Sequence, residues 1–153
     1  MAYQLAQVNV ARPKGPMDSE VMAQFAALLE PVNALADASH GFVWRLQDES
    51  GDATAIRPFD DQTIMVNMSV WQSIDLLWDF VYRTMHIEVL RRRREWFEHF
   101  GQTYTALWWI EAGTLPTLED AKERLAHLEA NGLSAYAFTF KQRFLPTGAA
   151  IAA

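Results

Sequence analysis

The side chains best suited to acid–base chemistry are His86 and Tyr82, which lie four positions apart in the chain. Side chains at this spacing share one face of a helix, and Trp78 extends the row by another four positions. Histidine, with an unperturbed pKa of about 6.5, can exchange a proton at neutral pH or ligate haem iron. We therefore expect His86 to be the acid–base group of a small-molecule site, with Tyr82 as proton donor or orienting group. The competing interpretation is a structural histidine that its neighbours hydrogen-bond.

Polar side chains on one face of three predicted strands form the second chemical feature. Within residues 64–71, strand alternation places Asn67, Ser69 and Trp71 on one face and an apolar row on the other. Residues from the other two strands, Gln7, Asn9 and Arg45, are expected to converge on the same face. The substrate-binding residues that we expect, in a barrel-like cavity at a dimer interface, are Asn67, Trp44, Arg45, Trp71, Ser69 and Asn9. The alternative is that these side chains have their hydrogen bonds satisfied at an interface or face solvent, because polar sheet faces are common in antiparallel proteins.

Charged side chains suggest fewer functions. The four arginines at residues 91–94 wrap around one helical turn, so their charge mainly complements a helix C-terminus and pairs with nearby acids. One of them, with Arg93 as the candidate, could reach an anionic substrate. The net charge of −6 and the pI near 5.1 argue against nucleic-acid and anionic-membrane partners. Glu95 and His99 share a helical face but lack a third ligand, so we expect no metal site.

Hydrophobic periodicity and turn residues predict the elements that position these side chains. Five strands are expected, at residues 3–10, 42–47, 63–71, 103–110 and 136–140. Helices are expected from Asp18 or Ser19, with a kink or end at Pro31, then from Ser73 to about Phe97, and from Thr117 to Asn131. The first six elements are in the ferredoxin-like order, so the predicted fold is α+β, with an extra C-terminal helix and strand.

The chain is expected to be one domain, residues 1–153, with a core at about 3–141 and a flexible tail at 147–153. A ferredoxin-like sheet has helices on one face, so its other face must be covered, and pairing two sheets in a homodimer is a common solution. The apolar row at residues 64–70 is expected to pack under the helices. The N-terminus lacks a signal-peptide pattern and no apolar run approaches a membrane span of about 18 residues. We therefore expect a cytoplasmic protein without a membrane partner.

Several segments resemble a bacterial family known as a domain of unknown function. These segments are residues 7–11, 42–46, 66–71, 80–83 with His86, 92–97 and 107–109. The family belongs with the dimeric α/β-barrel proteins, alongside antibiotic-biosynthesis monooxygenases, and the resemblance spans roughly residues 5–140. His40 departs from the pattern, which has proline before the glycine, and this affects only the turn geometry. The resemblance implies the fold and a dimer; the superfamily contains cofactor-free oxygenases, haem enzymes, isomerases and non-catalytic members.

These observations predict an enzyme that acts on a small hydrophobic or aromatic metabolite by oxygenation, cyclisation or isomerisation. His86 would be its acid–base group, and no cofactor is expected. One alternative is a haem protein with His86 as axial ligand. The other is a non-catalytic ligand-binding or assembly domain, so the sequence leaves open whether the chain is an enzyme at all.

Overall fold

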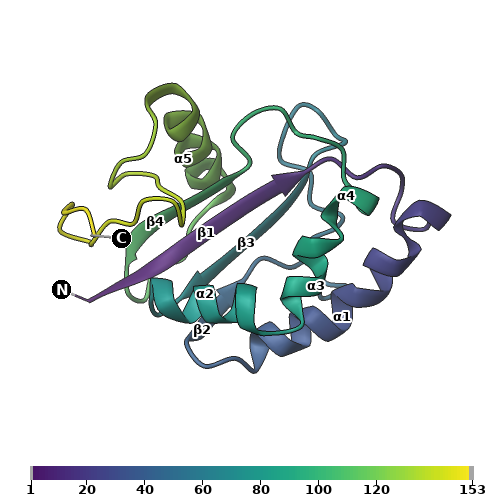
Figure 1. Cartoon of the computed structure of the whole chain (residues 1–153), viewed down its shortest axis with the longest axis horizontal. Coiled ribbons are helices and arrows are strands. Elements are labelled where there is room, and N and C mark those ends of the chain that lie inside the picture. Colours follow the sequence, from purple (N-terminus) through teal and green to yellow (C-terminus); the bar gives the residue numbers. More distant parts are fainter. Residues whose placement is uncertain (1, 152–153) are drawn as a thin grey trace.

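The computed structural model describes residues 2–151 of the chain. Its centre is an antiparallel sheet of four strands, β1 (Tyr3–Ala11), β2 (Phe42–Arg45), β3 (Met65–Trp71) and β4 (Thr105–Glu111), in the order β2-β3-β1-β4 (Figure 1). The helices α1 (Ala23–Asp37) and α2 (Ile74–Arg83) connect the strands in the ferredoxin-like sequence β-α-β-β-α-β. The predicted α+β fold class is therefore confirmed.

The first helical region begins with a 3₁₀ turn, Glu20–Met22, before α1. Ser19 occupies the N-cap position of that turn but makes no capping bond through its side chain. Pro31 lies inside α1, which continues to Asp37 without ending near Glu30. Of the two outcomes expected at Pro31, a kink or an end of the helix, the structure therefore excludes the end.

The long helix expected from Ser73 to Phe97 is divided into three, which corrects the sequence prediction. α2 is followed by α3 (His86–Arg91) and α4 (Arg93–Trp96). The first break is at Thr84, whose backbone is extended (φ −121°, ψ −175°). The Thr84 hydroxyl donates to the Phe80 carbonyl at 2.5 Å and accepts from the His86 backbone N–H at 3.3 Å. A side chain that hydrogen-bonds nearby backbone groups in this way competes with the helix ladder and ends the helix.

Both faces of the sheet are covered within the one chain. The apolar face includes Val8, Met68 and Val70, and it packs against α5 (Leu118–Asn131) and the segment around Phe59. The opposite face lies under α1 and α2. The apolar row at residues 64–70 therefore packs under the added C-terminal helix and not under the two connecting helices. This face does not need a second subunit to bury it.

The C-terminal helix α5 begins with a capping box at Thr117, where the sequence predicts the helix to start. Thr117 accepts from the Asp120 backbone N–H, and the Asp120 carboxylate accepts from that of Thr117. The expected strand at residues 136–140 takes the form of an isolated bridge, in which Phe138 and Leu107 exchange two backbone hydrogen bonds.

The end of the described chain folds back on itself. The Ile151 backbone N–H donates to the Arg143 carbonyl at 2.8 Å, and Phe144 and Ile151 pack against the core under α2. Residues 147–151, expected to be flexible, are thus held by a hairpin; residues 152 and 153 lie outside the described range.

Candidate functional site

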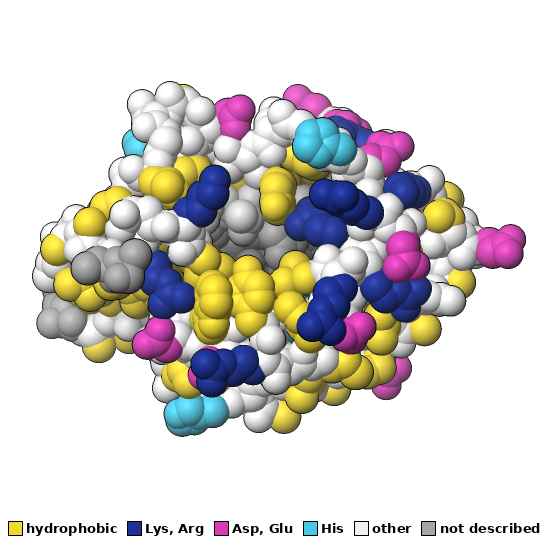
Figure 2. All heavy atoms as spheres, in the orientation of Figure 1, with side chains coloured by type: hydrophobic (Ala, Val, Ile, Leu, Met, Phe, Trp, Pro, Cys, Tyr) yellow, Lys and Arg dark blue, Asp and Glu magenta, His cyan; other side chains and the backbone are white. Residues whose placement is uncertain are grey.

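A cavity of about 300 Å³ lies between the sheet and the helices α1, α2 and α3. Its size is at the lower end of the range for small-molecule sites, roughly 300–1,000 Å³. Figure 2 shows this face of the molecule hollowed at its centre, with hydrophobic and Lys or Arg side chains around the hollow. Most of the cavity lining is apolar, and the polar side chains that line it include Gln7, Asn9, Arg45, Asn67, Ser69, His86 and Arg93.

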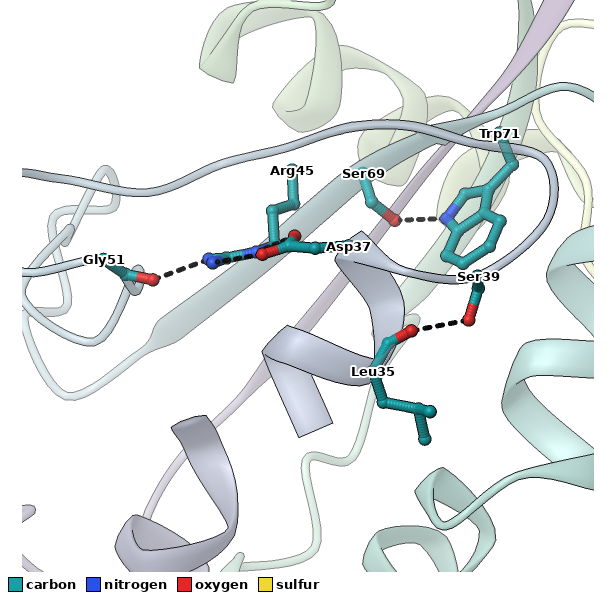
Figure 3. Close-up of polar contacts among 7 residues, drawn as sticks. All are labelled: Leu35, Asp37, Ser39, Arg45, Gly51, Ser69 and Trp71. Carbon is teal, nitrogen blue, oxygen red and sulfur yellow. Dashed lines mark hydrogen bonds and ion pairs between the residues drawn. The ribbon is translucent and has the colours of Figure 1, made fainter. Parts of the chain in front are cut away.

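The floor of the cavity is a hydrogen-bonded group of four side chains, Gln7, Asn67, Ser69 and Trp71, called here the floor cluster. Antiparallel pairing of β1 with β3 places Gln7 opposite Ser69. The Gln7 amide nitrogen donates to Asn67 Oδ1 at 2.8 Å and to Ser69 Oγ at 2.7 Å. The Trp71 indole donates to the same Ser69 oxygen at 2.8 Å (Figure 3). Strand register therefore brings together residues that are about sixty positions apart in the sequence.

The floor cluster presents hydrogen-bond donors to the cavity. Ser69 Oγ already accepts two hydrogen bonds, so its own hydrogen is free to be donated. Asn67 uses its oxygen as an acceptor from Gln7, which leaves its amide nitrogen as a donor, and its side chain is exposed within the cavity. A ligand that meets this floor must supply acceptors.

His86 lies in the wall of the cavity at the start of α3. Its ring packs on Phe80 with ring centres 5.1 Å apart, and its buried Nδ1 has no hydrogen-bond partner among residues 2–151. Burial lowers the pKa of His86 below its ordinary value of 6.5, and the nearby Val81 backbone opposes this shift. The ring is therefore neutral at pH 7. Because Nδ1 is enclosed by the protein, a ligand in the cavity would meet the exposed part of this partly buried ring.

Tyr82 lines the same cavity but does not pair with His86 as the continuous-helix pattern suggested. It lies at the end of α2, across the break at Thr84, and its ring packs on Trp78 with centres 4.1 Å apart. The structure shows no hydrogen bond between Tyr82 and His86 within the described chain. The tyrosine is about half exposed, which places it at the rim of the cavity.

The two predicted residues of β2 are placed differently. Arg45 lines the cavity, but its guanidinium is bound to the Asp37 carboxylate at 2.8 Å and to the Gly51 carbonyl at 2.6 Å (Figure 3). Trp44 packs on the opposite, apolar face of the sheet, so its predicted place in the pocket is wrong. Adjacent residues of a strand point to opposite faces, so Trp44 does not share the cavity side with Arg45. A register shift between Phe42 and Trp44 puts Phe42 on the cavity side as well.

The cavity residues that the sequence analysis missed include Phe80 and Tyr104, and the buried stripe of α2 is the signal that could have pointed to Phe80. Phe80 lies three positions after Leu77 on the buried stripe of α2 and stacks on Trp71, with centres 5.1 Å apart. Tyr104 precedes β4, and its ring lies under the Arg93 guanidinium at 4.6 Å. Arg93 itself, the candidate among the four arginines, lines the cavity together with Tyr104.

The described part of the chain has neither a metal-binding cluster nor a membrane-spanning helix. Among residues 2–151 there is no group of three or more His, Cys, Asp or Glu side chains that could hold a metal ion. No helix in the described part of the chain has the length and apolar character needed to cross a bilayer.

Comparison with known proteins gives a family and several distant structural likenesses. The chain is similar to SnoaB, a cofactor-independent oxygenase from Streptomyces nogalater, with 18% identity over 76% of this chain and 100% of that one, and a TM-score of 0.45. It is also similar to a protein of unknown function from Nitrosomonas europaea, with 13% identity over 75% of this chain and 96% of that one, and a TM-score of 0.46. No functionally curated protein matches it. A family profile described as "Domain of unknown function (DUF3291)" matches residues 4–152, nearly the whole chain, so the chain belongs to this family.

Proposed function

We propose that this chain is an enzyme that binds a small hydrophobic or aromatic molecule in the cavity and moves a proton with His86. The observation that carries the proposal is the neutral, partly exposed His86 ring in the wall of the cavity. Such perturbed groups in a cleft are typical of functional sites.

The proposed step is abstraction of a proton from an acidic O–H or C–H of the ligand. The proton moves to the neutral imidazole, and the electron pair of the broken bond stays on the ligand as an enolate or phenolate. The donors of Ser69 and Asn67 at the floor would stabilise the developing negative oxygen. Oxygenation, cyclisation and isomerisation of an aromatic metabolite can each begin with such an anion, and the proposal includes all three.

A solvent-exchange experiment tests this step without knowledge of the natural substrate. The probe is 2-tetralone, a two-ring ketone with slowly exchanging acidic C–H groups, and proton NMR in D₂O follows the exchange. We expect the protein to accelerate it, and His86→Gln to remove at least about a hundredfold of the acceleration.

The matched control is His127→Gln. His127 also has a buried Nδ1 without a partner in the described chain, but it lies on α5, away from the cavity lining. Equal exchange rates in the wild type and in His86→Gln would refute the acid–base role. Binding of 2-tetralone without accelerated exchange would instead indicate a non-catalytic ligand-binding domain.

Haem binding is the second candidate, because axial ligation would use the same neutral His86 ring in the cavity wall. The small volume of the cavity favours the acid–base function over a site for a large macrocycle. An absorbance scan with added haemin separates the two. A Soret band that is shifted by the wild type and not by His86→Gln would support the haem site, and an unchanged spectrum would exclude it.

The predicted homodimer and cytoplasmic location are also proposals. Because α5 already buries the apolar sheet face, a dimer would have to form through another surface. Light scattering on the purified chain measures its mass directly, and a mass equal to the 17.4 kDa of one chain would refute the dimer.

A further inference from the structure

The charges around the cavity are strongly one-sided. The chain as a whole is acidic, with 19 Asp and Glu against 13 Lys and Arg. Yet no Asp or Glu is among the described residues that line the cavity, whereas Arg45 and Arg93 are. An adjoining groove shares Tyr82, Tyr104 and Phe140 with the cavity, and Lys141 is the charged residue in its described lining. A concave site with charge of one sign concentrates ligands of the opposite sign.

Arg93 is the cation in the cavity lining whose charge is not compensated. Arg45 is neutralised by Asp37 at 2.8 Å. Within residues 2–151 no carboxylate pairs with Arg93; its guanidinium rests instead on the Tyr104 ring, 4.6 Å from the ring centre. Both side chains are partly exposed, so this pair lies at the opening of the cavity.

Two of the neighbouring arginines are paired with acids, and the third, Arg94, is exposed outside the cavity lining, which makes Arg93 distinctive within the run. Arg91 is paired with Glu88 at 2.8 Å, and Arg92 with Glu95 at 2.9 Å. Stacking on an aromatic ring orients a guanidinium and leaves its N–H edge free for a carboxylate, which it can hold with two parallel hydrogen bonds.

We propose that the cavity selects small hydrophobic or aromatic carboxylates, and that Arg93 holds the carboxylate at the opening. This inference rests on the proposed function, since it names the substrate class of the same site. The apolar body of the ligand lies against the helices, and an oxygen at its far end meets the donors of Asn67 and Ser69. Both ends of the site thus offer hydrogen-bond donors, and the opening also offers a positive charge.

The test compares an acid with its neutral amide of the same shape. The probes are 2-naphthoate and 2-naphthamide, with benzoate and benzamide as a smaller pair, each titrated into the full chain by calorimetry. A hydrogen-bonded charge contributes enough to make the wild type prefer each acid by roughly tenfold to a hundredfold. The preference is expected to weaken as salt is added, because the opening is exposed to solvent.

Variants assign the preference to one residue. Arg93→Gln is expected to bring acid and amide to within about threefold of one another, with little change in amide binding, and Arg93→Lys to retain part of the preference. The control is Arg94→Gln, which removes the same charge from the next, exposed residue outside the cavity lining. It is expected to bind like the wild type.

Each outcome decides the proposal. Acids and amides that bind the wild type equally would overturn the carboxylate preference and leave ligand binding in the cavity intact. A preference that survives Arg93→Gln, or that Arg94→Gln removes equally, would overturn the role of Arg93. No binding by any of the four probes would overturn the carboxylate proposal, whereas the exchange of 2-tetralone would still report on the proposed function.

Discussion

Replacing Ser69 by alanine should destabilise the fold by about 1–3 kcal/mol. Ser69 Oγ accepts from the Trp71 indole at 2.8 Å and from the Gln7 amide at 2.7 Å. Trp71 is only 1% exposed, so without the hydroxyl its N–H is buried with no acceptor, which costs about 1–3 kcal/mol. Gln7 still donates to Asn67 at 2.8 Å, so the loss of its bond to Ser69 costs less than the loss of the indole bond.

A double-mutant cycle with Trp71→Phe tests this division of the energy. In the phenylalanine background the indole N–H no longer exists, so Ser69→Ala removes only the bond from Gln7, worth about 0.5–1.5 kcal/mol. The two substitutions should therefore be coupled by about 1 kcal/mol, measured by urea unfolding of the four proteins at one pH. If Ser69→Ala has the same effect in both backgrounds, the buried indole bond is not the source of the loss.

Ser39→Ala is the matched control for the loss of a serine hydroxyl. The Ser39 hydroxyl donates to the Leu35 carbonyl at 2.7 Å near the end of α1 (Figure 3). Both residues are partly exposed, so water can replace the hydroxyl there. We expect this variant to lose about 0.5 kcal/mol, clearly less than Ser69→Ala. Equal losses at the two positions would refute the argument from burial.

Two further predictions concern pH and a turn. Burial lowers the pKa of His86 in the folded chain, so the unfolded chain takes up a proton first as the pH falls below 6.5. The stability that the neutral ring contributes is therefore complete above pH 6.5 and is lost as the pH falls towards the pKa of the folded chain. Urea unfolding from pH 7.5 to 5 should therefore show a smaller decline for His86→Gln than for the wild type, and parallel declines would contradict the burial of this ring. Gly41→Ala should destabilise the chain by at least about 1 kcal/mol more than Gly132→Ala. Both glycines have positive φ, but an added Cβ at Gly41 would lie 2.8 Å from Leu76 Cβ, whereas nothing lies within 4 Å at Gly132. Thermal unfolding measures the difference, and equal Tm values for the two variants would show that the Leu76 side chain moves aside at little cost.

Much of the fold and part of the cavity could be predicted from local patterns. The alternation in residues 65–71 identified the polar and apolar faces of β3, and the pattern in β1 predicted that Gln7 and Ser69 would share one face of the sheet. That they lie directly opposite one another follows from the strand register. Trp44 was assigned to the pocket although alternation puts it on the face opposite Arg45, where the structure has it. The side of Phe42 could not be predicted, because the register shift after it comes from pairing with β3. The break at Thr84 was missed because helical periodicity continues across it, while the hydroxyl bond to Phe80 that ends α2 is a detail of the local geometry.

The sequence by itself determined which side chains share a strand face and that His86 and the floor cluster are polar groups among apolar ones. Only the tertiary structure decided which layer covers each face. The apolar face is buried by α5, and the polar face becomes the floor of a cavity under α1 and α2. Periodicity comes from the backbone geometry of a single element, whereas layer order depends on packing between elements far apart in the chain. For the same reason, the sequence could name Arg93 as the candidate of the arginine run but not its position over the Tyr104 ring.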